Sequence, residues 1–180
     1  MGEMTEAAPE IRQLAARRGL VVERLPDTID RDSYTPALLG LLNNILLWGG
    51  SRVFHRRHGI GTNEWRIVSA LGNWPGATAK ELCELLGINK SVASKSVKLL
   101  LEREDIAQLD GPRGSRHLYL TAQGARVHDD CMPIALDRQR ILLESLSPEE
   151  VGTLNALLVR MLDSSASMQA YERDIVSDAS

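Results

Sequence analysis

The sequence predicts a mainly α-helical protein with one small β-hairpin, and three observations support this fold class. Helix-capping patterns recur along the 180 residues, as in TAKE (residues 78–81) and SPEE (residues 147–150). Only GIN (residues 87–89) separates two helical segments, a spacing typical of a helix-turn-helix. Two short segments with alternating apolar residues follow, 106–109 and 116–120, and they predict a two-stranded hairpin. Together these elements predict a winged helix-turn-helix.

Each predicted helix has a start or a stop signal. The first long helix begins at Thr35 and Pro36, which suit the cap and the first helical position, and it stops at Gly59. The next helix starts after Thr62 and ends at NWPG (residues 73–76), with four apolar residues at helical spacing: Trp65, Ile67, Val68 and Leu71. After residue 121 we expect one long helix to about residue 145, and a last helix from residue 147 onward.

The domain organisation follows from these elements. Residues 1–33 are mixed in charge and contain two prolines, Pro9 and Pro26, and we expect a partly ordered N-terminal arm with a short helix. Residues 34–60 form a predicted dimerisation helix, residues 61–121 the winged helix-turn-helix lobe, and residues 122–180 the C-terminal dimerisation helices. The apolar stripes of the terminal helices have nothing else to cover them, which predicts a homodimer.

Composition and motifs exclude several classes of protein. The net charge is −3, so any surface for nucleic acid must be a local basic patch. The opening residues do not resemble a secretory leader, and the longest apolar run, residues 38–50, is interrupted by Asn43 and Asn44 and too short to span a bilayer. We therefore expect a cytoplasmic protein without a membrane span. GxSxG, HExxH and phosphate-binding glycine motifs are absent from the sequence, so we expect neither an enzyme nor a cofactor.

The second helix of the helix-turn-helix has an unusual first half. INKSVASKSVKLLLE (residues 88–102) opens with small, polar and positive side chains, although an acidic first turn would suit the helix dipole better. Such a helix lies in the major groove of double-stranded DNA, where lysines contact phosphates or guanine and serines pair with base edges. The basic hairpin tip adds further cations. The candidate DNA contacts are Asn89, Lys90, Ser91, Ser94, Lys95, Lys98, Arg113, Arg116 and His117.

These motifs together resemble the MarR (multiple antibiotic resistance regulator) family of bacterial transcription factors. The resemblance rests on TNEWRIVSAL (residues 62–71), the helix-turn-helix (residues 78–102) and LYLTAQG (residues 118–124), and it spans about residues 35–165. It implies a homodimeric, ligand-responsive regulator, most often a repressor that leaves a pseudo-palindromic operator when a small effector binds. The wing (residues 111–114) lacks the family's aspartate, and Asp105 stands where a glycine usually ends the recognition helix.

An effector site is predicted beside the first long helix. On a helical wheel Arg52 shares the apolar arc of Leu38, Leu41, Ile45 and Trp48, and a charge on such a face requires a counter-ion. An anionic effector, such as an aromatic carboxylate or an acyl thioester, would meet this need. The alternative is that Arg52 extends to solvent or pairs with an acid of the partner subunit. The candidate ligand contacts are Trp48, Arg52, His55 and Trp65.

Other functions remain open at this point. A winged helix can bind protein instead of DNA, and Cys83 or Cys131 would allow a thiol-based redox-sensing repressor if its pKa were lowered. Nothing adjacent to either cysteine in the sequence lowers its pKa. His55-Arg56-Arg57-His58 lacks nearby carboxylates or thiols, and we interpret it as a basic helix end and not as a metal site.

Overall fold

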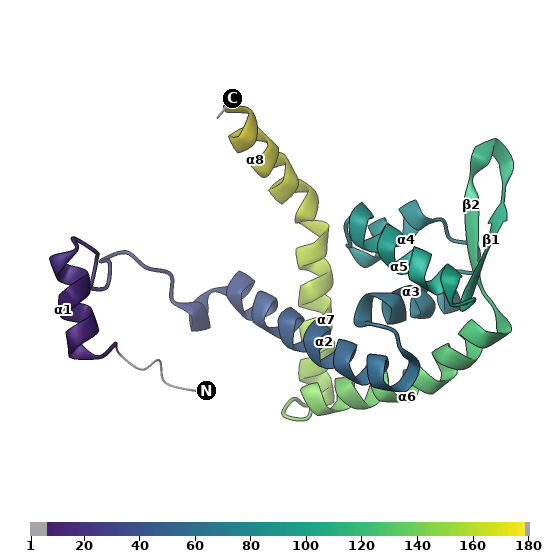
Figure 1. Cartoon of the computed structure of the whole chain (residues 1–180), viewed down its shortest axis with the longest axis horizontal. Coiled ribbons are helices and arrows are strands. Elements are labelled where there is room, and N and C mark those ends of the chain that lie inside the picture. Colours follow the sequence, from purple (N-terminus) through teal and green to yellow (C-terminus); the bar gives the residue numbers. More distant parts are fainter. Residues whose placement is uncertain (1–6, 179–180) are drawn as a thin grey trace. The chain divides into compact units, whose positions relative to one another are not determined.

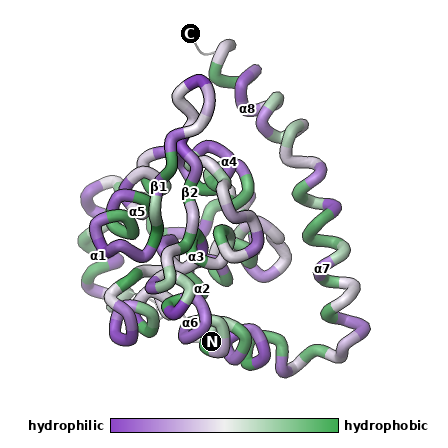
Figure 2. The backbone as a smooth tube through the Cα atoms, turned by 90° about the vertical axis from the view of Figure 1, so that its right-hand side faces the viewer, coloured by the Kyte–Doolittle hydropathy of each residue, from purple (hydrophilic) through white to green (hydrophobic). Residues whose placement is uncertain are grey.

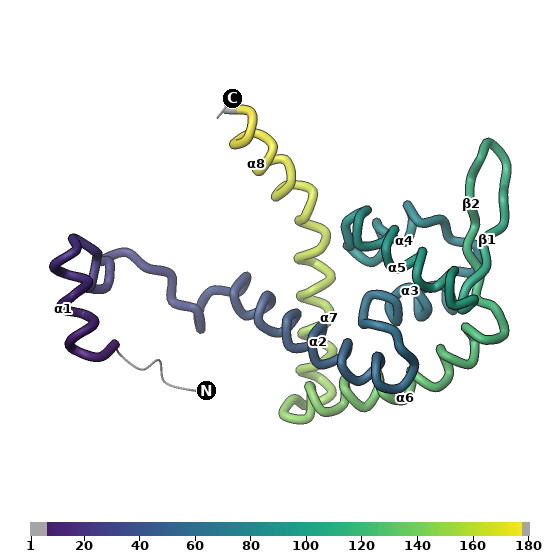
Figure 3. The backbone as a smooth tube through the Cα atoms, viewed as in Figure 1, coloured from purple at the N-terminus to yellow at the C-terminus, as the bar shows by residue number. Residues whose placement is uncertain are grey.

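The computed structural model describes residues 7–178, whose fold is mainly helical with a two-stranded antiparallel hairpin, as predicted (Figure 1). The chain divides into two compact units, with the boundary between Trp48 and Gly49. Figure 3 follows the elements in chain order. They are α1 (Pro9–Arg17), α2 (Thr35–His58), α3 (Thr62–Asn73), α4 (Ala79–Leu86), α5 (Lys90–Glu102), β1 (Ile106–Asp110), β2 (Arg116–Leu120), α6 (Ala122–Leu142), α7 (Pro148–Asp163) and α8 (Ser165–Asp178).

The first unit contains the predicted short helix of the arm. Pro9 begins α1, and Gly19 leaves it with a φ of 69°, a conformation that glycine adopts without strain. The segment after α1 folds back, so that Arg12 Nη2 lies 2.8 Å from Glu23 Oε1. This pair is exposed, so it adds little stability.

Helix α2 is longer than the apolar run within it. In the part of the chain that the structure describes, it is the one helix long and apolar enough to cross a membrane by length and composition. The expectation concerned the apolar run alone; residues on both sides of this run extend the helix to 24 residues. Length and composition alone are weak evidence for a span, since a helix that packs against other protein meets the same test.

The helix-turn-helix and the hairpin form one lobe with α3. In the hairpin, Ile106 lies opposite Leu120 and Asp110 opposite Arg116. The turn before α4 bonds to β2, because Gly76 N donates to Leu118 O at 2.8 Å and Leu118 N donates to Ala77 O at 3.1 Å. The hairpin is thus attached along β2 to the start of the helix-turn-helix.

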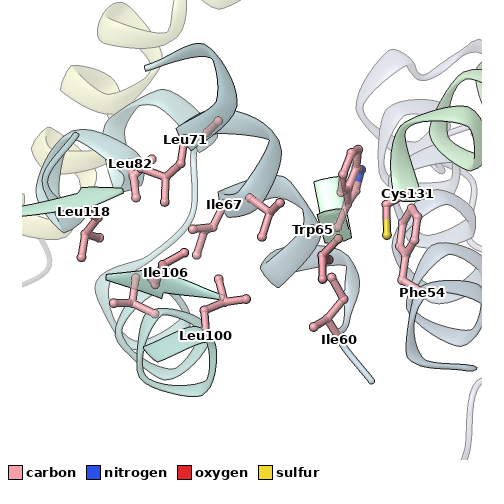
Figure 4. Close-up of a cluster of buried hydrophobic side chains, with 14 residues drawn as sticks. Phe54, Ile60, Trp65, Ile67, Leu71, Leu82, Leu100, Ile106, Leu118 and Cys131 are labelled. Carbon is pink, nitrogen blue, oxygen red and sulfur yellow. The ribbon is translucent and has the colours of Figure 1, made fainter. Parts of the chain in front are cut away.

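The core of this lobe draws on every element around it (Figure 4). Ile67 and Leu71 from α3, Leu82 from α4 and Leu100 from α5 are all buried, and Ile106 and Leu118 add one side chain from each strand. Burial of each such side chain contributes about 1.5–3 kcal/mol. A second part of the core joins α2, α3 and α6, where the rings of Phe54 and Trp65 lie 5.5 Å apart beside the buried Cys131.

The C-terminal region has three helices, where two were predicted. Helix α6 ends at Leu142, and α7 begins with the predicted capping box, in which Ser147 N donates to Glu150 Oε2 at 2.8 Å. A separate helix, α8, follows after Ser164. Apolar and polar residues alternate along α7 (Figure 2), and the two helices expose large apolar side chains: Leu154, Leu157, Met161, Leu162, Met168, Tyr171, Ile175 and Val176.

Candidate nucleic-acid interface

The helix-turn-helix is fixed by local contacts at both ends of its turn. Thr78 and Glu81 form the predicted capping box at the start of α4, with Thr78 N donating to Glu81 Oε2 at 2.7 Å. These bonds from Thr78 lower the pKa of the Glu81 carboxyl. Gly87 leaves α4 in the left-handed region, with a φ of 59°. Asn89 then caps α5, because its Oδ1 accepts from Val92 N at 2.8 Å. This bond occupies the side-chain oxygen of Asn89.

Helix α5 separates an apolar inner face from a polar outer face. Ala93, Ser96, Val97 and Leu100 are buried, at the spacing of one helical face. The predicted DNA contacts lie on the other side, where Lys90, Ser91, Ser94, Lys95 and Lys98 are exposed. Lys98 pairs with Glu102, whose Oε1 lies 3.6 Å from Lys98 Nζ.

The wing tip is closed by its own hydrogen bonds. Gly111 N donates to Ser115 O at 2.7 Å, and Ser115 Oγ donates to Pro112 O at 2.9 Å. Arg113 stands exposed at the tip with a φ of 58°, a conformation that favours glycine. The tip therefore presents Arg113 without the aspartate that the family's pattern would supply.

His117 has a different environment from the other predicted contacts. Its Nδ1 lies 2.8 Å from Gly76 O and its Nε2 lies 3.0 Å from Ser115 Oγ. The half-buried ring thus joins the wing tip to the turn before α4, whereas Arg116 beside it is exposed. This geometry favours an anchoring role for His117 over direct contact with DNA.

A groove of about 1120 Å³ brings the two predicted surfaces together. Lys90, Ser94 and Lys98 line it from α5, and Gly114, Ser115 and Arg116 line it from the wing. Its floor contains apolar atoms of Ala93, Val97, Leu101 and Leu118, while Lys80 adds a further cation from α4. Two carboxylates, Glu84 and Glu102, also line the groove, but its four cations outnumber them, so the groove is net positive and suited to a polyanion.

The end of α5 differs from the expected pattern. Asp105 was the predicted equivalent of the family's terminal glycine, but Glu104 is the residue in the left-handed region, with a φ of 60°. Asp105 is instead fully buried, and its carboxylate accepts from Arg103 Nε at 2.7 Å and from Gln123 Nε2 at 2.9 Å. A buried carboxylate requires such partners, so Asp105 joins α5 to α6.

Trp65 has different surroundings from the other predicted ligand contacts. Trp65 is only 7% exposed and packs between Phe54 and the ring of His128, 5.8 Å away. It lines a hollow of about 290 Å³ with Arg66 and Trp74, and neither Arg52 nor His55 lines that hollow. Arg52 and His55 are exposed on α2, as is Trp48.

The two cysteines differ in accessibility, and both are free thiols. Cys131 is buried, and this burial, with Asp130 nearby, raises the pKa of the thiol to about 11. This burial and raised pKa are typical of a core thiol. Cys83 is partly exposed and lines the groove. Among residues 7–178, no group of three or more His, Cys, Asp or Glu side chains is placed to hold a metal ion.

Two polar contacts that orient the helix-turn-helix were missed in the sequence. Ser96 Oγ donates to Glu64 Oε1, and Arg66 Nη2 donates to Leu86 O at the end of α4. Partial burial lowers the pKa of Arg66. The helical phase of α5 could have revealed the first contact, since Ser96 shares the spacing of Ala93 and Leu100.

Comparisons with known proteins find relatives of similar sequence and solved structures of similar fold. The model of the MarR family matches residues 58–117. The HTH-type transcriptional regulator PetP of Rhodobacter capsulatus is 25% identical over 109 residues, which cover 59% of this chain and 66% of PetP, just under two thirds of its length. A MarR/EmrR family transcriptional regulator from Acinetobacter sp. ADP1 is 27% identical with a TM-score of 0.72, and the match covers 77% of this chain and 99% of that one. The S. aureus MepR–DNA complex is similar in fold, at 17% identity and a TM-score of 0.65, covering 75% of this chain and 99% of MepR.

Proposed function

Since the chain belongs to the MarR family of transcriptional regulators, we propose that it is a repressor that binds double-stranded DNA and leaves it when a small anionic effector binds. The family consists of regulators and not of enzymes. In the proposed complex the start of α5 enters the major groove, and the wing tip reaches the neighbouring phosphates or minor groove.

The basic groove between α5 and the wing is the observation that carries this proposal. Its two walls supply Lys90, Lys98 and Arg116, and the exposed face of α5 adds Lys95. The first turn of α5 contains no acidic residue. No side-chain carboxylate therefore repels a phosphate there, and the positive end of the helix dipole is free to attract one. Small serines on the same face allow the helix backbone to approach base edges.

A second copy of the chain is the proposed partner for the exposed apolar side chains of the terminal helices. Leu157 and Met161 on α7, and Tyr171 on α8, are about half exposed or more, and solvated rows of this kind indicate an interface. A twofold homodimer presents two α5 helices. The operator should then be pseudo-palindromic, with half-sites about 10 bp apart.

The effector is proposed to act near Arg52. This exposed cation follows Ser51, whose Oγ donates to Thr62 Oγ1 at 3.1 Å and accepts from Thr62 N at 3.2 Å. An anion bound to Arg52, such as an aromatic carboxylate, would therefore act directly beside the contact between α2 and the start of α3. Displacement of that contact is the proposed route to release of DNA.

Selection from a random duplex library tests the proposal, because such a library samples all possible half-sites. Purified protein is incubated with the library, the bound duplexes are amplified over several rounds, and the enriched sequences are aligned. We expect an inverted repeat with half-sites about one helical turn apart. Failure to enrich any sequence would contradict the proposal. Failure even to bind duplex at low salt would favour a winged-helix module that binds protein.

The selected duplex then allows a screen for effectors. Anionic aromatic carboxylates and acyl thioesters are added to the complex, and fluorescence anisotropy of the labelled duplex reports release. An anion that releases DNA from the wild type but not from Arg52→Ala would support the proposed site. Release that is equal in both would contradict the role of Arg52. Release by peroxide and its reversal by dithiothreitol would instead favour a redox-sensing repressor, with Cys83 as the reactive thiol.

A further inference from the structure

Glu64 lies in the first turn of α3, and its carboxylate joins two separate parts of the lobe. One oxygen, Oε2, accepts from Gly61 N at 2.7 Å and so caps the start of α3. The other, Oε1, accepts a hydrogen bond from Ser96 Oγ on α5. A single side chain therefore ties the beginning of one helix to the middle of another.

Ser96 is the polar residue on the inner face of α5. It is 3% exposed, and its helical neighbours on that face are Ala93, Val97 and Leu100. Apolar contacts alone allow a helix to shift or rotate slightly, whereas a buried hydrogen bond has a preferred distance and direction. The bond to Glu64 thus fixes the rotation of α5 about its own axis. Ser94 and Lys95, on the opposite face, move with any such rotation.

The α2–α3 junction is packed closely around the same carboxylate. A Cβ atom at Gly61 would lie 2.6 Å from Glu64 Oε2, and a Cβ atom at Gly50 would lie 2.6 Å from Thr62 Oγ1. Thr62 in turn bonds to Ser51 on α2. Hydrogen bonds therefore lead from α2 through the start of α3 to α5.

We propose that Glu64 is a positioning residue for sequence-specific DNA recognition, which sets the orientation of α5 through Ser96 and links that orientation to the α2–α3 junction. The inference rests on the proposed function. Because Glu64 lies behind α5, it acts on specificity and not on attraction to phosphates. Its loss should therefore reduce discrimination between DNA sequences more than affinity for DNA in general.

Two substitutions at Glu64 separate geometry from charge. Glu64→Ala removes the bridge and one negative charge. Glu64→Gln removes the same charge but keeps the shape, and its amide oxygen can accept from Gly61 N while its amide nitrogen donates to Ser96 Oγ. The readout is the ratio of affinities for the selected duplex and a scrambled duplex, measured by anisotropy. We expect the ratio to fall about tenfold or more in Glu64→Ala, because displaced base contacts contribute little free energy of discrimination. In Glu64→Gln we expect it to remain near the wild-type ratio.

A third variant perturbs the bridge from the junction side. Gly61 has a φ of −92°, which alanine adopts without strain, so Gly61→Ala should act mainly by displacing the Glu64 carboxylate. We expect it to lower the ratio in the wild type and to have no further effect in the Glu64→Ala background. Circular dichroism checks whether Glu64→Ala folds. If it does not, Gly61→Ala still tests the bridge.

The outcomes distinguish this inference from the proposed function. A wild type that selects no duplex would overturn both. A selective wild type whose Glu64→Ala and Gly61→Ala variants keep the full ratio would overturn the positioning role alone. An equal loss in Glu64→Ala and Glu64→Gln would also overturn it, because the effect would then arise from the lost charge.

Discussion

Replacement of Lys95 by alanine tests the DNA-facing surface quantitatively. Lys95 is exposed on the outer face of α5 and, among the residues the structure describes, makes no ion pair, whereas Lys98 is close to Glu102. Each protomer presents five cations on this surface: Lys90, Lys95, Lys98, Arg113 and Arg116. A dimer in which all of them neutralise phosphates would show a slope of about −9 for log K against log salt concentration.

In the proposed homodimer, Lys95→Ala removes two of these cations. The slope should therefore become shallower by about 1.8, so that a fourfold rise in salt, from about 50 to 200 mM, weakens the variant about 12-fold less than the wild type. At low salt the variant should bind more weakly than the wild type. Anisotropy of a labelled duplex over a series of salt concentrations measures both quantities.

Arg126→Ala is the matched control for this measurement. Arg126 is also an exposed cation, but it lies on the second turn of α6 and not on α5 or the wing tip. We expect its slope and affinity to match those of the wild type. If Lys95→Ala leaves the slope unchanged, or if both variants change it equally, the assignment of the α5 face to DNA is wrong.

Three further predictions concern stability, anchoring and thiol chemistry. Thr78→Ala removes the cap of α4 and should cost about 1 kcal/mol, lowering Tm by about 2–4 °C in thermal unfolding, and an unchanged Tm would contradict the capping role. His117→Ala should weaken DNA binding, because the wing loses its bond to Gly76 O, and equal affinity of variant and wild type would refute this anchoring. At pH 8 an alkylating reagent should modify Cys83 but not Cys131, because a pKa of about 11 leaves about 0.1% of the buried thiol ionised. This selectivity would be contradicted if mass spectrometry found Cys131 modified as fast as Cys83 in the folded protein.

Local signals predicted most of the lobe correctly. The capping box at Thr78 and Glu81, the left-handed exit at Gly87 and the outer face of α5 all depend on residues within one or two turns of each other. Such contacts are encoded by spacing along the chain, so they can be inferred before any tertiary structure is known.

Contacts between distant residues were not predicted. Glu64 and Ser96 are 32 positions apart, and His117 and Gly76 are 41 apart. Residue type alone assigns Ser96 and His117 to the surface, because lysine-rich and serine-rich segments are usually solvated. Packing decides which of these side chains turn inward, and it depends on elements elsewhere in the chain.

The surroundings of Arg52 could not be predicted from the sequence for a different reason. The helical wheel places Arg52 on the apolar side of α2, but the structure leaves that residue exposed. A wheel identifies which residues share a face and not what covers that face. If α2 packs against a second copy of the chain, as in the proposed homodimer, the surface that covers this face belongs to another molecule, and the sequence of one chain cannot show which group lies opposite Arg52.

Selective DNA binding is proposed for the surface formed by α5 and the wing. The most direct test compares the affinity of the wild type for its selected duplex with that for a scrambled duplex, at low and at physiological salt. We expect a preference of about 10³-fold or more at physiological salt and a steep loss of affinity for both duplexes as salt rises. Equal affinity for the two duplexes, or affinity that does not change with salt, would contradict it.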